Sequence, residues 1–378
     1  MKQFDVLIVG AGIVGCAVAR ECALAGLHTG VLEGGVPGGG ATAAGMGHVV
    51  VMDDSPAQFA LTGYSRSLWQ IEHQALPPSV EYEARGTVWV AADEEEMVEV
   101  RAKYVAYQSA GIEATILTPE KLAAAEPNLR RGLAGGLLVP GDGVIYPPAA
   151  AGYFLSEARR LGAEVIFSRA VKASNGVVRT ANGSFVRAEK IVLAVGTECD
   201  LLPALPIEKR KGHLLITDRY PGFLRHQLVE LGYLKSAHQS LEDSVAFNIQ
   251  PRQTGQMLLG SSRQFGSVGS RAESEIMRRM LDRAREYMPG LAQISALRVW
   301  TGFRASTKDK LPLIGPAKGL SDDESLWLAA GFEGLGITNA LGAARLLVDG
   351  MLARKSVISV SPYLPERLTG AAQRMAHV

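Results

Sequence analysis

Cysteine is scarce in this sequence, which has three among 378 residues, at Cys16, Cys22 and Cys199. They are too few and too widely spaced for a disulfide framework, and no C-x-x-C pair indicates a metal site. We therefore predict a protein with no bound metal in a reducing, cytoplasmic compartment.

Charge and long apolar runs are limited as well. Charged residues make up 20% of the chain and the formal net charge is +1, so the surface offers no strong field for nucleic acid or an anionic membrane. The uncharged stretch 6–19 is shorter than the roughly 20 residues of a spanning helix, and glycines break it. We predict no membrane span. A signal peptide is also disfavoured, because Asp5 interrupts the apolar start and cleavage would remove the first strand.

Glycine, by contrast, is abundant, with 42 residues, and its first cluster follows an apolar strand at residues 4–9. In the sequence Gly-Ala-Gly-Ile-Val-Gly, Gly10 permits a sharp turn, Gly12 allows backbone to approach a pyrophosphate, and Gly15 lets a helix pack on the strand. A simple glycine turn is the alternative. The helical pattern over residues 13–26 favours a dinucleotide site, with the diphosphate at the helix start beside Ile13 and Val14.

Glu33 completes this unit. It ends a second apolar stretch, residues 28–32, about 20 positions beyond the turn, where a ribose hydroxyl needs an acceptor. The carboxylate favours an unphosphorylated ribose, as in FAD or NAD, and disfavours NADP. From these residues alone, FAD and NAD both stay open.

A second glycine-rich stretch, residues 34–48, is too poor in bulky residues to build a core. Because it directly follows Glu33, a loop that covers the cofactor is favoured over a flexible linker. His48 at its end is a candidate catalytic base, although a structural role is commoner for a lone histidine.

The rest of the chain predicts an α/β protein with two domains, since 378 residues exceed one ordinary domain. Helical periodicity covers residues 55–72, 94–110, 148–161, 272–288 and 341–352, and strands lie between these helices. We predict a discontinuous nucleotide-binding domain, residues 1–85, 145–210 and 300–378. Residues 86–144 and 211–299 form a substrate domain around an antiparallel sheet.

The last third is richest in chemically informative residues. Arg304 lies between aromatic and glycine residues, and the sequence is equally consistent with an internal ion pair or with a carboxylate-binding role. Glycines at 334 and 336 precede the last helix, as expected for a helix N-terminus aimed at developing negative charge, such as that of a reduced flavin.

As a set, these segments resemble the glycine oxidase, sarcosine oxidase and D-amino-acid oxidase family of FAD enzymes over nearly the whole chain. The resemblance is carried by the glycine turn with Glu33, residues 43–46, Lys211-Gly212, residues 300–304, Lys308-Asp309 with residues 312–315, and residues 334–337. Within the family, residues 36–42 and 259–263 look most like the flavin subunits of D-hydroxyproline and opine dehydrogenases and a subunit of hydrogen cyanide synthase.

The resemblance implies a Rossmann-like FAD domain of the glutathione-reductase type and a catalytic site that includes Arg304, Asn248 and Met46. Arg304 would bind the substrate carboxylate, and Met46 would lie beside the flavin. The implied FAD contacts are Gly10, Gly12, Ile13, Val14, Gly15, Glu33, Gly34, Ala41, Thr42, Ala44, Gly45, Met46, Gly47, Val171, Ala194, Gly196, Gly302, Gly334, Leu335, Gly336, Ile337 and Thr338.

Three departures from the family pattern matter. Asn248 and Ala246 stand where glycine oxidase has a tyrosine and a nearby histidine, so the substrate pocket differs. No cysteine lies beside Arg304, which predicts noncovalent FAD. The oxygen-activating lysine of monomeric sarcosine oxidase is missing near Leu258, which favours a dehydrogenase over an oxidase.

The predicted function is oxidation of a small amino acid, of the D-hydroxyproline, proline, glycine or opine type, to its imine by hydride transfer to flavin N5. The alternative is a flavin-bearing subunit that relays electrons or supports an assembly, with the substrate site on a partner. Such partners would be an iron-sulfur or second flavin subunit, through which the cytoplasmic protein would associate with the inner membrane.

Overall fold

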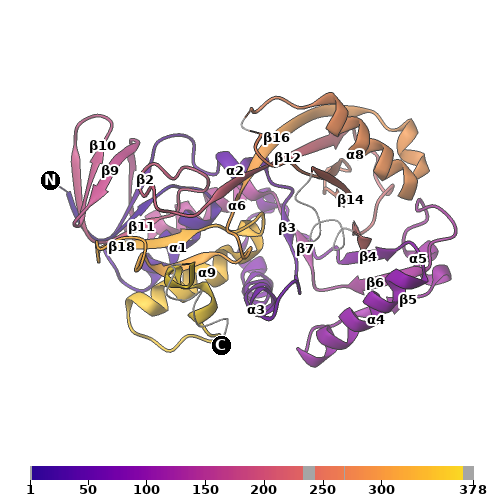
Figure 1. Ribbon diagram of the computed structural model, residues 1–378, viewed down its shortest axis with the longest axis horizontal. Helices are drawn as coiled ribbons and strands as arrows, with labels where there is room; N and C mark the ends of the chain where they lie inside the picture. Colours follow the sequence, from indigo (N-terminus) through magenta and orange to yellow (C-terminus); the bar gives the residue numbers. More distant parts are fainter. Residues whose placement is uncertain (1, 233–242, 268, 369–378) are drawn as a thin grey trace.

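The computed structural model describes residues 2–232, 243–267 and 269–368 and contains two parts, each built around an eight-stranded sheet (Figure 1). The first sheet has the order β17-β18-β11-β1-β2-β8, and the β9–β10 hairpin lies beside β11. Its central strands are parallel. The strands are β1 (Lys2–Val9), β2 (Thr29–Glu33), β8 (Glu164–Phe167), β9 (Ala170–Ser174), β10 (Val177–Thr180), β11 (Phe185–Leu193), β17 (Leu313–Pro316) and β18 (Leu326–Ala330).

Helices cover one face of this sheet. The side chains of β1 alternate between the core on that face and the core on the opposite face. Val6 and Ile8 pack into the core shared with the helices, whereas Leu7 and Val9 pack into the core of the opposite face. Helix α1 contacts both α6 and α9, and α3 contacts α9. These helices are α1 (Ile13–Leu24), α3 (Pro56–Glu72), α6 (Pro147–Arg160) and α9 (Gly336–Met351).

The second sheet has the order β16-β12-β15-β14-β13-β4-β6-β5. It is antiparallel, as predicted, except for the parallel pair β13–β4. No hairpin imposes an antiparallel arrangement there, because the chain passes through the first part between these two strands. The strands are β4 (Thr87–Ala91), β5 (Thr115–Leu117), β6 (Gly135–Val139), β12 (Glu208–Thr217), β13 (Gln227–Glu230), β14 (Ser244–Pro251), β15 (Met257–Arg263) and β16 (Ala296–Ser306).

Helices also pack on the second sheet. Helix α8 (Ser274–Tyr287) contacts β14 and β15, while α4 (Glu94–Ser109) and α5 (Pro119–Ala125) contact β6. A two-stranded link, β3 (His48–Val49) with β7 (Gly143–Val144), and the short helix α2 (Gly40–Ala44) lie between the two parts in Figure 1. Single 3₁₀ turns occupy His73–Ala75, Pro78–Val80, Pro289–Gln293, Ser361–Tyr363 and Pro365–Leu368.

The predicted fold class, an α/β nucleotide-binding part beside a sheet-based second part, is confirmed. The exact domain division stays a proposal. The boundaries placed after residues 210 and 299 fall inside β12 and β16, which pair with each other along almost their full lengths.

Three local predictions are corrected by the structure. The sequence pattern predicts two separate strands at residues 185–187 and 191–196, whereas residues 185–193 form one continuous strand, β11. The last helix begins at Gly336, five residues before the predicted start, because residues 337–340 are buried and extend its packed face. The glycine-rich stretch 34–48 is not entirely loop, since residues 40–44 form α2.

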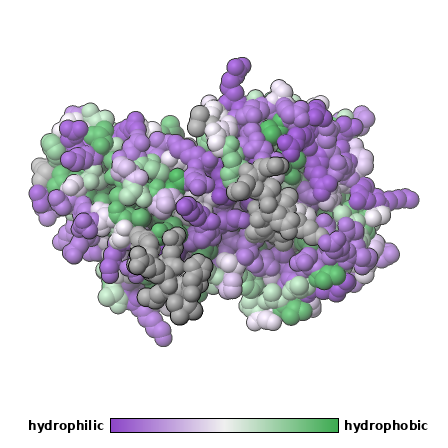
Figure 2. Space-filling view, in the orientation of Figure 1, coloured by the Kyte–Doolittle hydropathy of each residue, from purple (hydrophilic) through white to green (hydrophobic). Residues whose placement is uncertain are grey.

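Figure 2 shows a largely hydrophilic face, with hydrophobic residues gathered over the end that carries β9 and β10. The exposed hydrophobic residues include Phe167 at the end of β8, Val171 in β9 and Phe185 at the start of β11. In the part of the chain that the structure describes, no helix combines the length and apolar character needed to cross a bilayer.

Candidate active site

A pocket is lined by residues of both parts, and one end of it is formed by the glycine turn between β1 and α1. Gly10 has a φ of +106°, and a Cβ there would lie 2.5 Å from the Ala194 carbonyl oxygen. A Cβ on Gly15 would lie 1.9 Å from the Gly10 carbonyl oxygen. Both positions therefore require glycine, and the turn they permit places Gly12, Ile13 and Val14 at the pocket wall. The positive end of α1 faces this part of the pocket.

Glu33 is held by backbone groups at the end of β2. Its carboxylate accepts hydrogen bonds from the N–H of Ala11 and of Gly35, both at 2.6 Å. These two donors orient the carboxylate at the edge of the glycine turn. The ribose contact predicted for Glu33 stays a prediction.

The loop that follows Glu33 forms the next part of the wall. Ala41, Thr42, Ala44, Gly45 and Met46 all line the pocket. Thr42 is buried, and its hydroxyl oxygen accepts a hydrogen bond from the Ile13 N–H at 3.0 Å. The loop is thereby fastened to the start of α1. The prediction that residues 34–48 cover a cofactor is consistent with this placement.

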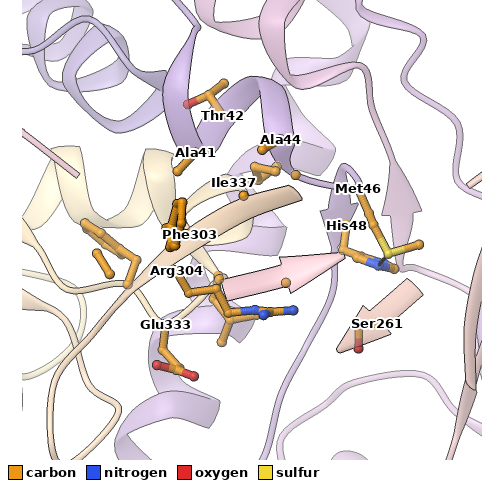
Figure 3. Close-up of a pocket in the computed structure, with 18 of the residues that line it drawn as sticks. Ala41, Thr42, Ala44, Met46, His48, Ser261, Phe303, Arg304, Glu333 and Ile337 are labelled. Atoms are coloured by element: carbon orange, nitrogen blue, oxygen red, sulfur yellow. Dashed lines mark hydrogen bonds between the residues drawn. The ribbon is translucent and has the colours of Figure 1, made fainter. Parts of the chain in front are cut away.

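The opposite wall comes from chain segments distant in sequence. Ala194 and Gly196 follow β11, Gly302 lies in β16, and residues 334–337 precede or begin α9. A Cβ on Gly45 would lie 2.8 Å from Cδ1 of Ile337, which shows how closely α9 approaches the loop. Figure 3 shows Ile337 near Ala44. The N-terminus of α9 thus faces the same pocket as the N-terminus of α1.

Several residues predicted as cofactor contacts do not line this pocket in the described part of the chain. Gly10 and Gly15 contribute by permitting the tight turn, and the Glu33 carboxylate lies at the edge of that turn. Thr338 donates a hydrogen bond from its hydroxyl to the His48 carbonyl oxygen at 2.9 Å. Val171 is 41% exposed on β9. The residues in this group are Gly10, Gly15, Glu33, Gly34, Gly47, Val171 and Thr338, and their cofactor contacts stay predictions.

All three residues predicted for catalysis lie in the pocket, at the end nearer the second sheet. Arg304 extends from β16, and its Nη1 donates a hydrogen bond to the Ser262 carbonyl oxygen at 2.9 Å. Asn248 lies in β14, and its buried Oδ1 has no hydrogen-bond partner among the described residues. In Figure 3 the Arg304 guanidinium points toward the side of the pocket that carries Met46 and His48.

Further residues at this end were not predicted as site residues. They are Asp54, Gln58, Thr87, Trp89, His213, Val229, Ser261, Arg263, Phe303, Lys310 and Glu333. They come from strands and loops of both parts, so their assembly depends on tertiary structure. Of these, Ser261, Arg263 and Phe303 carried a sequence signal, because they belong to the segments on which the family resemblance was based.

Charges are paired around one wall of this end. Oε1 of Glu333 lies 3.3 Å from Nη1 of Arg210 and 4.0 Å from Nη2 of Arg263. Burial and the nearby Arg263 lower the pKa of Lys310. Because Lys310 lines the pocket, the absence of a lysine near Leu258 does not leave the pocket without one.

The two histidines of the pocket are both kept neutral. Burial lowers the pKa of His48 to about 4. Burial and the neighbouring Lys211 also lower the pKa of His213. His213 uses both ring nitrogens within the protein, since Nδ1 bonds to the Ser262 hydroxyl and Nε2 accepts from the Glu273 N–H, each at 3.0 Å.

The parallel sheet, the glycine turn with Glu33 and the second helix N-terminus define a dinucleotide-binding oxidoreductase. Residues 5–350 match the FAD dependent oxidoreductase (DAO) family, and the chain belongs to that family. FAD fits the observed wall, because the positions closest to backbone are glycines and the lining is continuous from α1 to α9. The predictions of an enzyme, of FAD and of this family are confirmed.

Two relatives and one solved structure illustrate the similarity. A glycine oxidase from Pseudomonas aeruginosa is 26% identical, with 95% of this chain and 98% of the relative covered. One of the subunits of an opine oxidase from Rhizobium meliloti is 24% identical, with 83% and 85% covered. The structure of L-proline dehydrogenase from P. horikoshii superposes with a TM-score of 0.86 at 22% identity, with 97% and 98% covered.

Proposed function

We propose that this protein oxidises a small amino acid, of the D-hydroxyproline, proline, glycine or opine type, to its imine. The observation that carries the proposal is that Arg304 and the unsatisfied Asn248 Oδ1 share one pocket with the glycine turn at α1. A planar guanidinium can hold a carboxylate by two parallel hydrogen bonds. The similarity to a glycine oxidase supports an amino acid as the substrate.

The residues of the pocket bind and orient the substrate in this proposal. When bound, FAD supplies the electron sink, by accepting a hydride from the α-carbon at flavin N5. Arg304 holds the carboxylate, and Asn248 accepts a hydrogen bond from an N–H or O–H group of the substrate. Met46, Trp89 and Phe303 exclude water from the reacting carbon. Orientation of this kind is a large part of what such a reaction requires from the protein.

The experiment is an anaerobic titration of the purified yellow protein. Glycine, both enantiomers of proline and of 4-hydroxyproline, and an opine are added separately, and the loss of oxidised flavin absorbance is recorded. We expect at least one amino acid to bleach the flavin. If dithionite bleaches it and none of the amino acids does, the protein does not oxidise these substrates by itself.

A second candidate function is favoured by the Rhizobium meliloti relative, whose name marks it as one component of an opine oxidase with more than one kind of chain. Here the chain would carry FAD and relay electrons within a complex, and a partner would hold the substrate. The partner would be an iron-sulfur or second flavin subunit. The observation in favour of this second function would be that the whole complex, and not the isolated chain, is needed to bleach the flavin.

A further inference from the structure

A chain of buried polar side chains connects the pocket to an interior carboxylate. His48 Nδ1 bonds to Oε1 of Gln227, Gln227 Nε2 donates to the hydroxyl oxygen of Thr87, and that hydroxyl donates to Oδ2 of Asp142 at 2.6 Å. Gln227, Thr87 and Asp142 are each 0% exposed. At the pocket end, His48 Nε2 lies 3.4 Å from the sulfur of Met46. The four linked side chains come from β3, β13, β4 and the turn between β6 and β7.

Hydrogen bonds at the interior end partly offset the cost of burying the Asp142 carboxylate. Its Oδ1 accepts from Nη1 of Arg66 at 3.2 Å and from the Val51 N–H at 3.3 Å. Burial raises the pKa of Asp142 to about 6, so the carboxyl is still ionised at pH 7.5. An ionised carboxylate can only accept hydrogen bonds. The donor and acceptor of each hydrogen bond can therefore be assigned, starting from Asp142.

The assignment of donors and acceptors continues along the linked side chains to His48. The Thr87 hydroxyl has one proton, which it gives to Asp142, so its oxygen must accept from the amide N–H of Gln227. The amide oxygen of Gln227 then faces His48, and an amide oxygen can only accept. His48 therefore carries its proton on Nδ1, and its Nε2 presents a lone pair to the pocket.

Met46 does not use this lone pair. A thioether sulfur has no proton to donate, so the contact with Met46 is a packing contact for Nε2. His213, the other pocket histidine, differs because its Nε2 accepts a backbone N–H from Glu273. His48 is thus the pocket histidine whose ring nitrogen is available to accept from a ligand.

We propose that His48 Nε2 accepts a hydrogen bond from the N–H of the substrate amine and so positions the amine while Arg304 binds the carboxylate. This inference rests on the proposed function. The amine is bonded to the carbon that loses the hydride, so it must lie on the cofactor side of the pocket. His48 directly follows the cofactor loop, and its Nε2 lies 3.4 Å from the sulfur of Met46, a loop residue that lines the pocket.

His48 acts as a neutral acceptor and not as a general base. A ring with a pKa of about 4 is far too weak a base to take a proton from an aliphatic ammonium group. It can still compensate the amine N–H for the hydrogen bond to water that is lost on entering the pocket. No proton is transferred between His48 and the amine in this step.

One test observes the tautomer directly in the FAD-loaded wild-type protein. With ¹⁵N-labelled histidine at pH 7.5, long-range ¹H–¹⁵N spectra distinguish protonated from unprotonated ring nitrogens. The His48 signals are assigned by their loss in His48→Gln. We expect a protonated Nδ1 and an unprotonated Nε2. A proton on Nε2 would overturn the inference, and this test requires no substrate.

A second test compares two planar carboxylates that the enzyme cannot oxidise to an imine. Pyrrole-2-carboxylate has a ring N–H, and furan-2-carboxylate has an oxygen in its place. Binding is measured by the change in flavin absorbance. His48→Asn retains a donor near the position of Nδ1 and lacks Nε2, whereas His48→Gln places an amide oxygen near the position of Nε2.

We expect His48→Asn to weaken binding of pyrrole-2-carboxylate by at least about tenfold, the effect of one hydrogen bond of roughly 1.4 kcal/mol. Binding of furan-2-carboxylate should change less than about twofold. His48→Gln should recover part of the loss. Equal losses for both ligands would contradict the inference, as would an Asn248→Leu variant that abolishes the pyrrole preference when His48→Asn does not.

The two tests also separate this inference from the proposed function. If neither carboxylate binds the wild type and no amino acid bleaches the flavin, the proposed function fails, whatever the tautomer. If amino acids bleach the flavin and His48→Asn leaves the pyrrole preference intact, the proposed function holds and the role of His48 fails. If His48→Asn loses FAD, the tautomer of His48 measured in the wild-type protein still tests the inference.

Discussion

Replacement of Arg304 by lysine tests the carboxylate-binding role most directly. The guanidinium lies in a narrow slot between two glycines of neighbouring segments. A Cβ on Gly212 would lie 2.7 Å from its Nη1, and a Cβ on Gly334 would lie 3.1 Å from its Nε. A lysine side chain lacks the branched guanidinium and is therefore narrower at the level of the slot. We therefore expect Arg304→Lys to fold, to retain FAD and to melt near the parent temperature.

The expected loss follows from the number of hydrogen bonds. Arg304 uses one N–H for the Ser262 carbonyl oxygen and can offer two parallel donors to a carboxylate. A lysine ammonium is a single point charge and cannot reproduce the paired geometry. Losing one charge-assisted hydrogen bond costs roughly 1.5–3 kcal/mol, so the efficiency with amino acids should fall at least about tenfold.

The assay is anaerobic stopped-flow reduction of the flavin by an amino acid and by the matching amine that lacks the carboxylate. The amine should react with similar rates in both proteins. Arg298→Lys is the matched control, because Arg298 is exposed on the same strand, with its guanidinium over Trp300. Unfolding, loss of FAD, or an equal effect on carboxylate and non-carboxylate substrates would refute the role of Arg304.

Four further predictions concern the cofactor, the acceptor and the interior carboxylate. Acid precipitation should leave the flavin in the supernatant, because none of the described residues that line the pocket is a cysteine; flavin in the pellet would refute this. Glu33→Ala should retain less FAD after dialysis, since a charge-assisted hydrogen bond to ribose is worth roughly 1.5–3 kcal/mol, and unchanged occupancy would place the ribose elsewhere. Turnover should be much faster with an artificial dye than with oxygen, and comparable peroxide formation in air would point to Lys310 as an oxygen-activating residue. Burial raises the pKa of Asp142 to about 6, above the unfolded value of about 3.9, so the native state binds this proton more tightly. Relative to Asp142→Asn, the wild-type free energy of unfolding in urea should therefore rise as the pH falls below 6, by about 1.4 kcal/mol per unit, and a constant difference would contradict the assignment.

The nucleotide-binding half of the fold could be predicted because local patterns determine it. An apolar strand, a glycine turn and a helix follow one another within the first 24 residues, and β1 and α1 appear as expected. The parallel pair β13–β4 could not be predicted in this way. It joins residues 87–90 to residues 227–230, and no local turn connects them.

The candidate site shows the same distinction. Arg304, Asn248 and Met46 were predicted through the family resemblance, and all three line the pocket. The chain from His48 to Asp142 could not be predicted, because its members are separated by up to 179 residues and none forms a motif with the next. Burial and mutual hydrogen bonding, which give these residues their roles, exist only in the folded protein.

One face of β16 determines how the loop of residues 34–48 and Arg304 are placed relative to each other. Side chains two residues apart on a strand share a face, so Trp300, Gly302 and Arg304 point the same way. The Trp300 indole N–H donates to the Ala44 carbonyl oxygen at 3.3 Å, and a Cβ on Gly302 would lie 2.4 Å from the Ala44 Cβ. The strand is therefore fastened to the cofactor loop at two consecutive positions of this face, and Arg304 occupies the third. Because the strand is rigid, the spacing between the loop and the guanidinium follows from β geometry and does not depend on the conformation of a flexible segment.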